Sequence, residues 1–488
     1  MMKKFEKQDV QQQEISLFEL LLKQRGIYVF TALFLCFAFR YFSRDLWFDE
    51  CLTLDLLYYC QDSLTVYRSY DIPNNHIVFS IFYRYWLLLI DKLAPQFIFF
   101  LMRLFPLAIA GIAAVWMFRT LQKRFSVYTA WCVGICIFLT PPVLIYGTGI
   151  RGYILGFLLA GAGMLCGRKI MKSGGWKNYI FYFLLSLAAV GTAPTNLASF
   201  FAIVLILSPC VWKHKNRILP LLYLLLIPFV SLAVFYLPIF DKFMGCIALK
   251  EGWSSAPAAA WNFYGAVLLC LLPCFIMFRI RKKLKLYALA FLLTLLIPAG
   301  VYLIFPTPPF PRVFLPLLAV WCLPLGYGIA GFLRKIPAEK KYIPVLCVFF
   351  WCALLTIFAS RIGDCLFTNG WQDDLTAPYY VRQDFLPSET VKKMEACRKN
   401  YPDAVFYVTF DSDYPSILYA SAHWADRDSV LWYDRPNANR LQSLPETGTL
   451  YFITRGEKDM EQARQRFGLP MPVEQIRCGA QNLWRFNR

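Results

Sequence analysis

The feature that most constrains the fold is a series of long apolar stretches that recur between residues 27 and 360. Each is close to the roughly 20 residues that cross the hydrocarbon core of a bilayer as a helix. The composition agrees, because 58% of the 488 residues are hydrophobic and only 17% are charged. We therefore expect a mainly α, polytopic transmembrane helical bundle of about 11 spans. The candidate spans are 27–42, 97–118, 127–146, 150–167, 178–193, 197–212, 219–238, 261–278, 286–304, 313–333 and 342–360.

One further apolar stretch, residues 76–90, carries Arg84 in its middle. An arginine at the centre of a bilayer costs about 2.5 to 3.5 kcal/mol. If this stretch does not cross, the short basic loops all fall on the side of the basic N-terminus, as the positive-inside rule requires. We therefore expect a helix that lies in the outer interface or dips back. The N-terminus is then cytoplasmic, and the first loop (43–96), the loop 305–312 and the C-terminal segment are outside.

The sequence pattern changes after residue 360. Short strand-like runs broken by Pro, Asp and Asn replace the long apolar stretches, and residues 457–468 look helical with a C-terminal glycine stop. The strand-like runs are 404–410, 417–424, 429–434 and 449–456. These patterns predict two domains, a transmembrane domain over residues 1–360 and a small exported α/β domain over residues 361–488.

The formal net charge of +19 does not indicate a nucleic-acid partner. The segment from Arg361 onward is close to neutral, so the positive excess lies in the short loops of the membrane part, as topology signals do. The three histidines are scattered, and the 16 cysteines lie mostly in apolar stretches without a CxxC pair, so we expect no metal site. Cys397 and Cys478 could pair in an exported segment, and the sequence leaves that pairing open.

The first outer loop is rich in carboxylates at the predicted membrane edge. Six acids lie between the first span and His76, and two of them, Asp49 and Glu50, are adjacent. One carboxylate of such a pair can accept a proton from an attacking hydroxyl, while its neighbour holds the acceptor or raises the pKa of the base. The alternative is that Asp49 caps a helix and that its neighbours are simply solvated.

Two arginines are predicted on the same side of the membrane, Arg151 in YGTGIRGY and Arg312 in PTPPFPRVF. The positive-inside rule does not explain cations at outer span ends, whereas the planar guanidinium suits the oxygens of a lipid-linked phosphate. Alternatively, each arginine snorkels or binds bulk anionic lipid. His76 begins the stretch 76–90, where its ring either hydrogen-bonds a substrate or caps the turn.

Five motifs, in this order and spacing, resemble the C-type (GT-C) membrane glycosyltransferases of the protein O-mannosyltransferase and aminoarabinose transferase-like group. They are LWFDECLTLDLL, NNHIVFSIFYRYW, FLMRLFPLAIAGIAAVWMFRTLQKRF, LTPPVLIYGTGIRGYIL and FPRVFLPLLAVWCLPLGYGI. The resemblance covers most of residues 27–335 and implies a bundle of that type. It makes Asp49 the catalytic base, and its implied ligands of the donor or its phosphate are Glu50, His76, Arg151, Tyr153 and Arg312.

The resemblance implies a hexosyl- or pentosyltransferase that moves a sugar from a polyprenyl-phosphate donor to a glycan, lipid or protein acceptor on the outer face of the membrane. The short cytoplasmic loops and the lack of an organellar targeting signal predict that this is a bacterial plasma (inner) membrane. Such a reaction inverts the anomeric configuration, modifies envelope glycans or glycoconjugates, and requires no cofactor and no metal. Expected partners are the lipid-linked sugar donor and membrane lipid. Two alternatives remain open: a flippase or transporter of lipid-linked oligosaccharide, which usually has charges within spans and internal repeats, and an O-antigen ligase or polymerase.

Overall fold

The computed structural model describes most of the helical part of the chain and much of the C-terminal segment. The described residues are 25–39, 46, 48–59, 62–69, 76–93, 98–213, 215–248, 268–269, 271–277, 285–304, 311–358, 387–409, 417, 430–432, 448–479 and 481–487. The chain divides into two compact units, residues 1–42 with 67–363, and residues 43–66 with 364–488. The first loop is thus split between the units, and the domain boundary expected at residue 360 stays a prediction.

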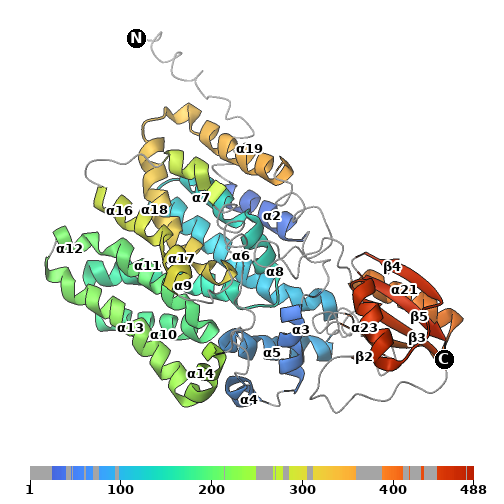
Figure 1. The fold of residues 1–488 in the computed structure, drawn as a ribbon. Coiled ribbons are helices and arrows are strands. Elements are labelled where there is room, and N and C mark those ends of the chain that lie inside the picture. Colours follow the sequence, from blue (N-terminus) through green and yellow to red (C-terminus); the bar gives the residue numbers. More distant parts are fainter. Residues whose placement is uncertain are drawn as a thin grey trace, which may run out of the picture. The chain divides into compact units, whose positions relative to one another are not determined.

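The first unit is a bundle of helices (Figure 1). Within it, the central helix α9 packs against α6, α10, α11 and α18. The α-helices are α2 (Gly26–Phe39), α5 (Ile77–Leu93), α6 (Ile98–Arg124), α7 (Val127–Phe138), α8 (Pro141–Thr148), α9 (Tyr153–Ser173), α10 (Trp176–Thr192), α11 (Leu197–Leu207), α12 (Pro209–Lys213), α13 (Ile218–Tyr236), α14 (Phe240–Ala248), α16 (Lys285–Leu295), α17 (Ile297–Ile304), α18 (Pro316–Leu333) and α19 (Tyr342–Phe358). Short 3₁₀ turns are η3 (Pro194–Asn196), η4 (Lys215–Arg217), η5 (Leu237–Ile239), η7 (Pro311–Phe314) and η8 (Ala338–Lys340).

Five helices among the described residues are long and apolar enough to cross a membrane. They are Phe100–Arg124, Tyr153–Ser173, Pro194–Val211, Lys215–Cys246 and Pro316–Leu333. A sixth span results if α7 and α8, which meet at a bend of 70°, count as one. The protein is therefore a multi-pass membrane protein, in which helices satisfy the backbone hydrogen bonds that lipid cannot. The expected count of 11 spans stays a prediction.

Proline and glycine explain two turns of this bundle. The bend between α7 and α8 coincides with Pro141 and Pro142, because proline lacks the N–H that continues a helix and is well suited to begin one. Between α9 and α10, Gly174 and Gly175 both have positive φ, at 65° and 90°, a conformation that glycine adopts without a steric penalty. This tight turn allows α10 to pack back along α9.

Helix α5 occupies the apolar stretch 76–90, in which Arg84 makes a crossing of the membrane unfavourable. Its buried side chains recur at helical spacing, at Phe79, Tyr83 and Leu87. The hydroxyl of Tyr83 donates to the carbonyl of Met102 at 3.1 Å, which ties α5 to α6. A helix over residues 76–90 is therefore confirmed, while its place in the outer interface stays a prediction.

The second unit contains a five-stranded sheet in the order β2-β1-β3-β5-β4. The strands are β1 (Val405–Val408), β2 (Val430–Trp432), β3 (Thr449–Thr454), β4 (Glu474–Cys478) and β5 (Gln481–Asn487), and the helices are α3 (Phe48–Tyr59), α21 (Pro387–Asn400), α23 (Glu457–Phe467) and the start of α4 (Ser63–Arg68). Strand β1 runs parallel to β2 and β3, and β5 runs antiparallel to β3 and β4. Alternate side chains point to opposite faces, so Phe406 and Tyr451 pack with Met394 of α21, whereas Tyr407 and Phe452 pack with Met460 of α23.

The strands expected over 404–410, 429–434 and 449–456 are confirmed as β1, β2 and β3. The run 417–424 lies outside the described residues except for Ile417. Cys397 and Cys478, whose pairing the sequence left open, are free thiols buried in the same core cluster. Burial raises the pKa of both thiols, that of Cys478 to about 11, so both are protonated at neutral pH.

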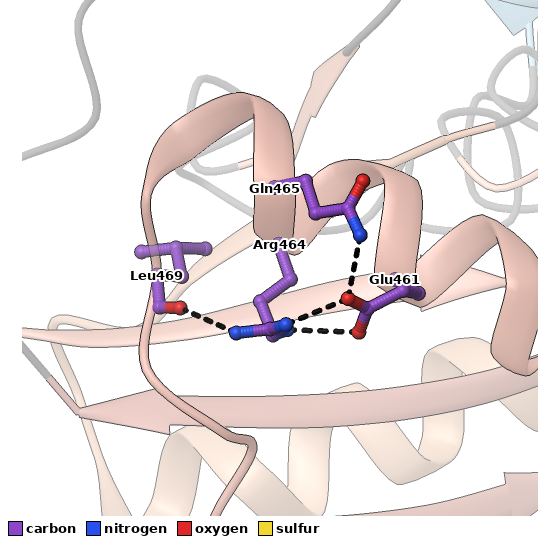
Figure 2. A network of polar contacts seen from close by, with 4 residues as sticks. All are labelled: Glu461, Arg464, Gln465 and Leu469. Carbon is purple, nitrogen blue, oxygen red and sulfur yellow. Dashed lines mark hydrogen bonds and ion pairs between the residues drawn. The ribbon is translucent and has the colours of Figure 1, made fainter.

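Helix α23 confirms the helix and glycine stop expected over residues 457–468. Its C-cap, Gly468, has a left-handed φ of 61°. Figure 2 shows the polar network at this end, where Arg464 donates to both carboxylate oxygens of Glu461, at 2.8 and 2.6 Å. Gln465 donates to the same carboxylate at 2.9 Å, and Arg464 also reaches the carbonyl of Leu469 at 3.5 Å. The hydrogen bonds from Arg464 and Gln465 lower the pKa of Glu461 to about 2.

Candidate active site

Asp49 and Glu50 lie in the first turn of α3, where the positive end of the helix dipole favours carboxylates. The helix begins at Phe48, so Asp49 lies inside the first turn and is not the residue that precedes it. The backbone carbonyl of Asp49 accepts a 2.9 Å hydrogen bond from the hydroxyl of Thr53, and the Glu50 side chain is buried. Both acids belong to the second unit.

The helical unit brings together the other four residues expected in the site. His76, Arg151, Tyr153 and Arg312 are each no more than 4% exposed. They come from three separate parts of the sequence: the residue before α5, the turn between α8 and α9, and η7 before α18. Burial of two guanidinium groups is costly unless each is hydrogen-bonded and electrically balanced. Such residues mark a functional site more often than a structural one in a membrane bundle.

The turn between α8 and α9 presents Arg151 and Tyr153 two residues apart. Helix α8 ends at Thr148, and the backbone N–H of Arg151 donates to the carbonyl of Gly149 at 2.8 Å. Helix α9 then begins at Tyr153. The ring of Tyr153 lies edge-on to that of Tyr146, with centroids 5.2 Å apart, so aromatic packing fixes the start of α9.

Arg312 approaches this turn from η7. Its Nε atom donates to the hydroxyl of Tyr153 at 2.9 Å, in a bond between buried groups. The other N–H donors of the guanidinium belong to its two terminal nitrogens. Because the guanidinium is planar, anchoring Nε also sets the direction of the whole fork.

His76 also packs against Tyr153. The two rings meet nearly at right angles, at 78°, with centroids 4.5 Å apart. His76 Nδ1 lies 3.1 Å from the carbonyl oxygen of Thr192, which assigns the proton to Nδ1 and leaves Nε2 as an acceptor. Nε2 is buried and has no hydrogen-bond partner among the described residues, so neither nitrogen caps α5. The substrate-contact alternative for His76 is thereby favoured over the capping one.

The electrostatic environment keeps His76 neutral. Burial lowers its pKa well below the usual value, the positive charges of Arg151 and Arg312 lower the pKa further, and the hydrogen bond to Thr192 opposes them. His76 precedes α5 and lies outside the candidate spans. The imidazole therefore offers a lone pair at Nε2 at neutral pH, beside two guanidinium groups.

Gly152 allows these residues to approach one another. A Cβ atom at this position would lie 2.6 Å from Thr192 Cγ2 and 2.9 Å from His76 Cβ, closer than real Cβ contacts. Any side chain there would separate α9 from the segment that holds His76. The glycine that follows Arg151 is thus a packing requirement of the site.

Arg103 is a further buried cation of this region, and the sequence alone does not indicate its role. It lies on α6, and its Nη1 donates to the carbonyl of Thr148, at the end of α8, at 3.1 Å. The signal was present in FLMRLFP, because a charge inside an apolar stretch is a functional or structural marker. Arg103 thereby supports the turn that carries Arg151.

Neither a family model nor a curated protein matches this sequence. The fold is similar to the crystal structure of ArnT from Cupriavidus metallidurans in the apo state, with a TM-score of 0.52 at 12% identity over 95% of this chain and 98% of that chain. The structure of the same protein bound to undecaprenyl phosphate aligns with a TM-score of 0.47 at 10% identity, over 94% of this chain and 98% of that chain. The chain therefore has an ArnT-like fold, which confirms the fold that the five motifs predicted.

Proposed function

We propose that this protein is an integral-membrane glycosyltransferase that moves a sugar from a polyprenyl-phosphate donor to an acceptor at the outer face of a bacterial plasma membrane. The observation that carries the proposal is the buried cluster of Arg151, Arg312, Tyr153 and His76 in a multi-pass bundle. The ArnT-like fold supports it at the level of architecture. In this topology the N-terminus is cytoplasmic and the C-terminal segment is exported.

Arg151 and Arg312 hold the phosphate of the donor. A guanidinium presents paired N–H donors whose spacing matches two oxygens of a phosphate, and such charge-assisted bonds are about twice as strong as neutral ones. Tyr153 orients Arg312 by accepting from its Nε, so the terminal nitrogens are directed before the donor arrives. The neutral His76 adds no third positive charge and provides an acceptor for a substrate hydroxyl.

Asp49 is the proposed general base, and Glu50 helps to hold the substrates. Asp49 takes the proton of the acceptor hydroxyl as its oxygen attacks the anomeric carbon from the face opposite the phosphate. The new carbon–oxygen bond forms as the bond to the phosphate oxygen breaks, which inverts the anomeric configuration. Polyprenyl phosphate leaves with the bonding electrons as an anion, so its departure needs no proton.

The test is transfer of labelled sugar from a polyprenyl-phosphate donor pool to endogenous acceptors in membrane vesicles. Wild type is compared with Asp49→Asn and with Asp62→Asn, each at matched expression. Asp62 is a suitable control because it is exposed and its Oδ1 accepts a 2.6 Å bond from the Thr65 N–H, a capping role that asparagine retains. We expect the rate of sugar transfer to fall by about 10²- to 10⁴-fold in Asp49→Asn and to stay unchanged in Asp62→Asn.

The outcomes separate the parts of the proposal. Equal transfer by wild type and Asp49→Asn would remove Asp49 from the mechanism. Absence of transfer by wild type with every donor in the pool would overturn the glycosyltransferase proposal and favour a transporter. The same vesicles identify the acceptor class, because labelled glycan, lipid and protein separate on extraction.

A further inference from the structure

The short turn η3 (Pro194–Asn196) joins α10 to α11 beside the buried cluster and carries two polar side chains that the proposed mechanism does not use. Asn196 is 2% exposed, and its Nδ2 donates to the carbonyl of Ala189 at 2.7 Å. That bond fixes the orientation of the amide, because only the NH₂ group can donate to a carbonyl. Oδ1 is then an acceptor, and it has no hydrogen-bond partner among the described residues.

Thr195 repeats this pattern at the neighbouring position. Its Oγ1 atom is buried and has no hydrogen-bond partner within the described part of the chain. A buried polar atom without a partner costs about 1 to 3 kcal/mol, so native structures contain few of them. Two on successive residues of one turn, beside a third at His76 Nε2, indicate a place where a bound molecule completes the hydrogen bonds.

Contacts place this turn at the same site. Thr192, which ends α10, accepts from His76, and η3 packs against η7, the turn that carries Arg312. On α9, a Cβ atom at Gly156 would lie 2.8 Å from Asn196 Nδ2 and 3.0 Å from its Oδ1. The Asn196 amide therefore lies against α9 one turn after Gly152, the glycine that contacts His76.

Two of these atoms, Asn196 Oδ1 and His76 Nε2, are acceptors and need a partner that carries an N–H or O–H group, which two parts of a lipid-phosphate donor lack. Phosphate oxygens are acceptors, so they cannot satisfy Asn196 Oδ1 or His76 Nε2, which also accept. A polyprenyl tail has no hydrogen-bonding groups. Sugar hydroxyls donate as well as accept, and the sugar is bonded directly to the phosphate that Arg151 and Arg312 would hold.

We infer that Thr195 and Asn196 recognise hydroxyl groups of the donor sugar and help to determine which sugar the enzyme accepts. The inference rests on the proposed function and assigns the sugar subsite to η3. Sites built to hydrogen-bond a hydroxyl discriminate strongly against ligands that lack it, because the buried groups of the site are then left unpaired.

The experiment measures binding by the purified full-length protein in lipid nanodiscs. The probes are undecaprenyl phosphate and undecaprenyl phosphate carrying glucose, mannose or arabinose. The variants are Thr195→Val, which removes one hydroxyl at nearly constant volume, and Asn196→Leu. The matched control is Thr31→Val, because the Thr31 hydroxyl donates to the Ile27 carbonyl within α2 at 2.7 Å.

We expect wild type and the Thr31→Val control to bind at least one sugar-bearing lipid more tightly than undecaprenyl phosphate. Thr195→Val should reduce that preference by about fivefold to thirtyfold, the loss expected for one hydrogen bond to a buried group, and leave the affinity for undecaprenyl phosphate unchanged. Asn196→Leu should reduce the preference to a similar extent if that variant folds. If Asn196→Leu does not fold, the result for Thr195→Val decides whether the inference holds.

A wild-type preference that Thr195→Val leaves unchanged would overturn the inference while the proposed function stands. Equal wild-type affinity for undecaprenyl phosphate and all three sugar-bearing lipids would also overturn it. Failure of the wild type to bind any of the four probes would instead overturn the proposed function. In the transfer assay, the variant should raise KM for the donor with little change in kcat, a split that a purely structural role would not produce.

Discussion

Arg312 Nε donates a hydrogen bond of 2.9 Å to the hydroxyl of Tyr153, a residue 159 positions earlier in the chain. The bond joins η7 to the first residue of α9 and is buried from solvent. Because Tyr153 also contacts the His76 ring, one phenol links a proposed phosphate ligand to a neutral imidazole. The arrangement of the cluster therefore depends on this tyrosine.

Tyr153→Phe should destabilise the protein by about 1 to 3 kcal/mol, because loss of the hydroxyl leaves a buried donor of Arg312 unsatisfied. It should also weaken binding of undecaprenyl phosphate, because the hydroxyl no longer sets the direction of the Arg312 guanidinium. Tyr236→Phe is the control, since the buried Tyr236 hydroxyl donates to the Val190 carbonyl at 3.0 Å. Both variants should lower the apparent melting temperature, and only Tyr153→Phe should alter lipid binding. If both variants bind undecaprenyl phosphate with the same affinity, Tyr153 has no part in phosphate binding.

Gly152→Ala should destabilise the protein by about 1 to 3 kcal/mol, the usual effect of overpacking. The new methyl group would meet Thr192 and His76 at under 3 Å. Gly152 has a φ of −73°, which alanine adopts freely, so backbone strain does not contribute. Gly111→Ala in α6 is the comparison, because nothing lies within 4 Å of its Cβ position. In thermal unfolding in detergent, Gly152→Ala should lower the melting temperature and Gly111→Ala should leave it unchanged.

The lowered pKa of His76 predicts a pH-dependent stability. The unfolded chain binds a proton at His76 near pH 6.5 and the folded chain does not, so acidification below about pH 6.5 favours unfolding. The charged groups that face the ring are Arg151 and Arg312, and both oppose protonation. From pH 7.5 to 5, wild type should lose stability faster than His76→Asn, by at most about 1.4 kcal/mol per pH unit. Parallel pH profiles of melting temperature would contradict the assignment of a neutral His76.

Arg103→Met should destabilise the helical unit by about 1.5 to 3 kcal/mol, the contribution of a hydrogen bond from a charged group. The bond from Arg103 to the Thr148 carbonyl supports the end of α8, so the Arg151 turn should also loosen. Arg119→Met on the same helix removes an exposed arginine and should change stability little. Hydrogen exchange at residues 149–152 provides the measurement, with faster exchange expected for Arg103→Met only.

The sequence predicted the helices of the bundle and three strands of the second unit because local patterns determine them. Apolar length produces the spans, and β-branched and aromatic runs between turn residues produce β1 and β3. Strand β4 and helix α21 gave no usable signal: β4 mixes Glu474 and Arg477 with apolar residues, and α21 is mostly polar.

The candidate site was predictable only in part. Arg151 and Arg312 are visible in the sequence because cations are unusual at span ends that are predicted to face outward, and His76 lies in a recognisable motif. The sequence spacing of these three residues does not predict that they lie close together, because tertiary packing brings them together. Thr195 and Asn196 were missed because polar residues in a turn between spans are ordinary in any membrane sequence. What distinguishes them is a buried polar atom that has no hydrogen-bond partner among the residues that the structure describes.

Helix α9 begins at Tyr153, directly after the turn that carries Arg151, and continues for 21 residues. The aligned peptide dipoles of a helix place about half of a positive charge at its amino end. This fixed charge does not depend on any side chain and cannot be removed by substitution at Arg151 or Arg312. An anion bound at this turn would therefore keep a residual attraction when either arginine is replaced by a neutral residue, so phosphate affinity should decline in steps instead of vanishing with one substitution.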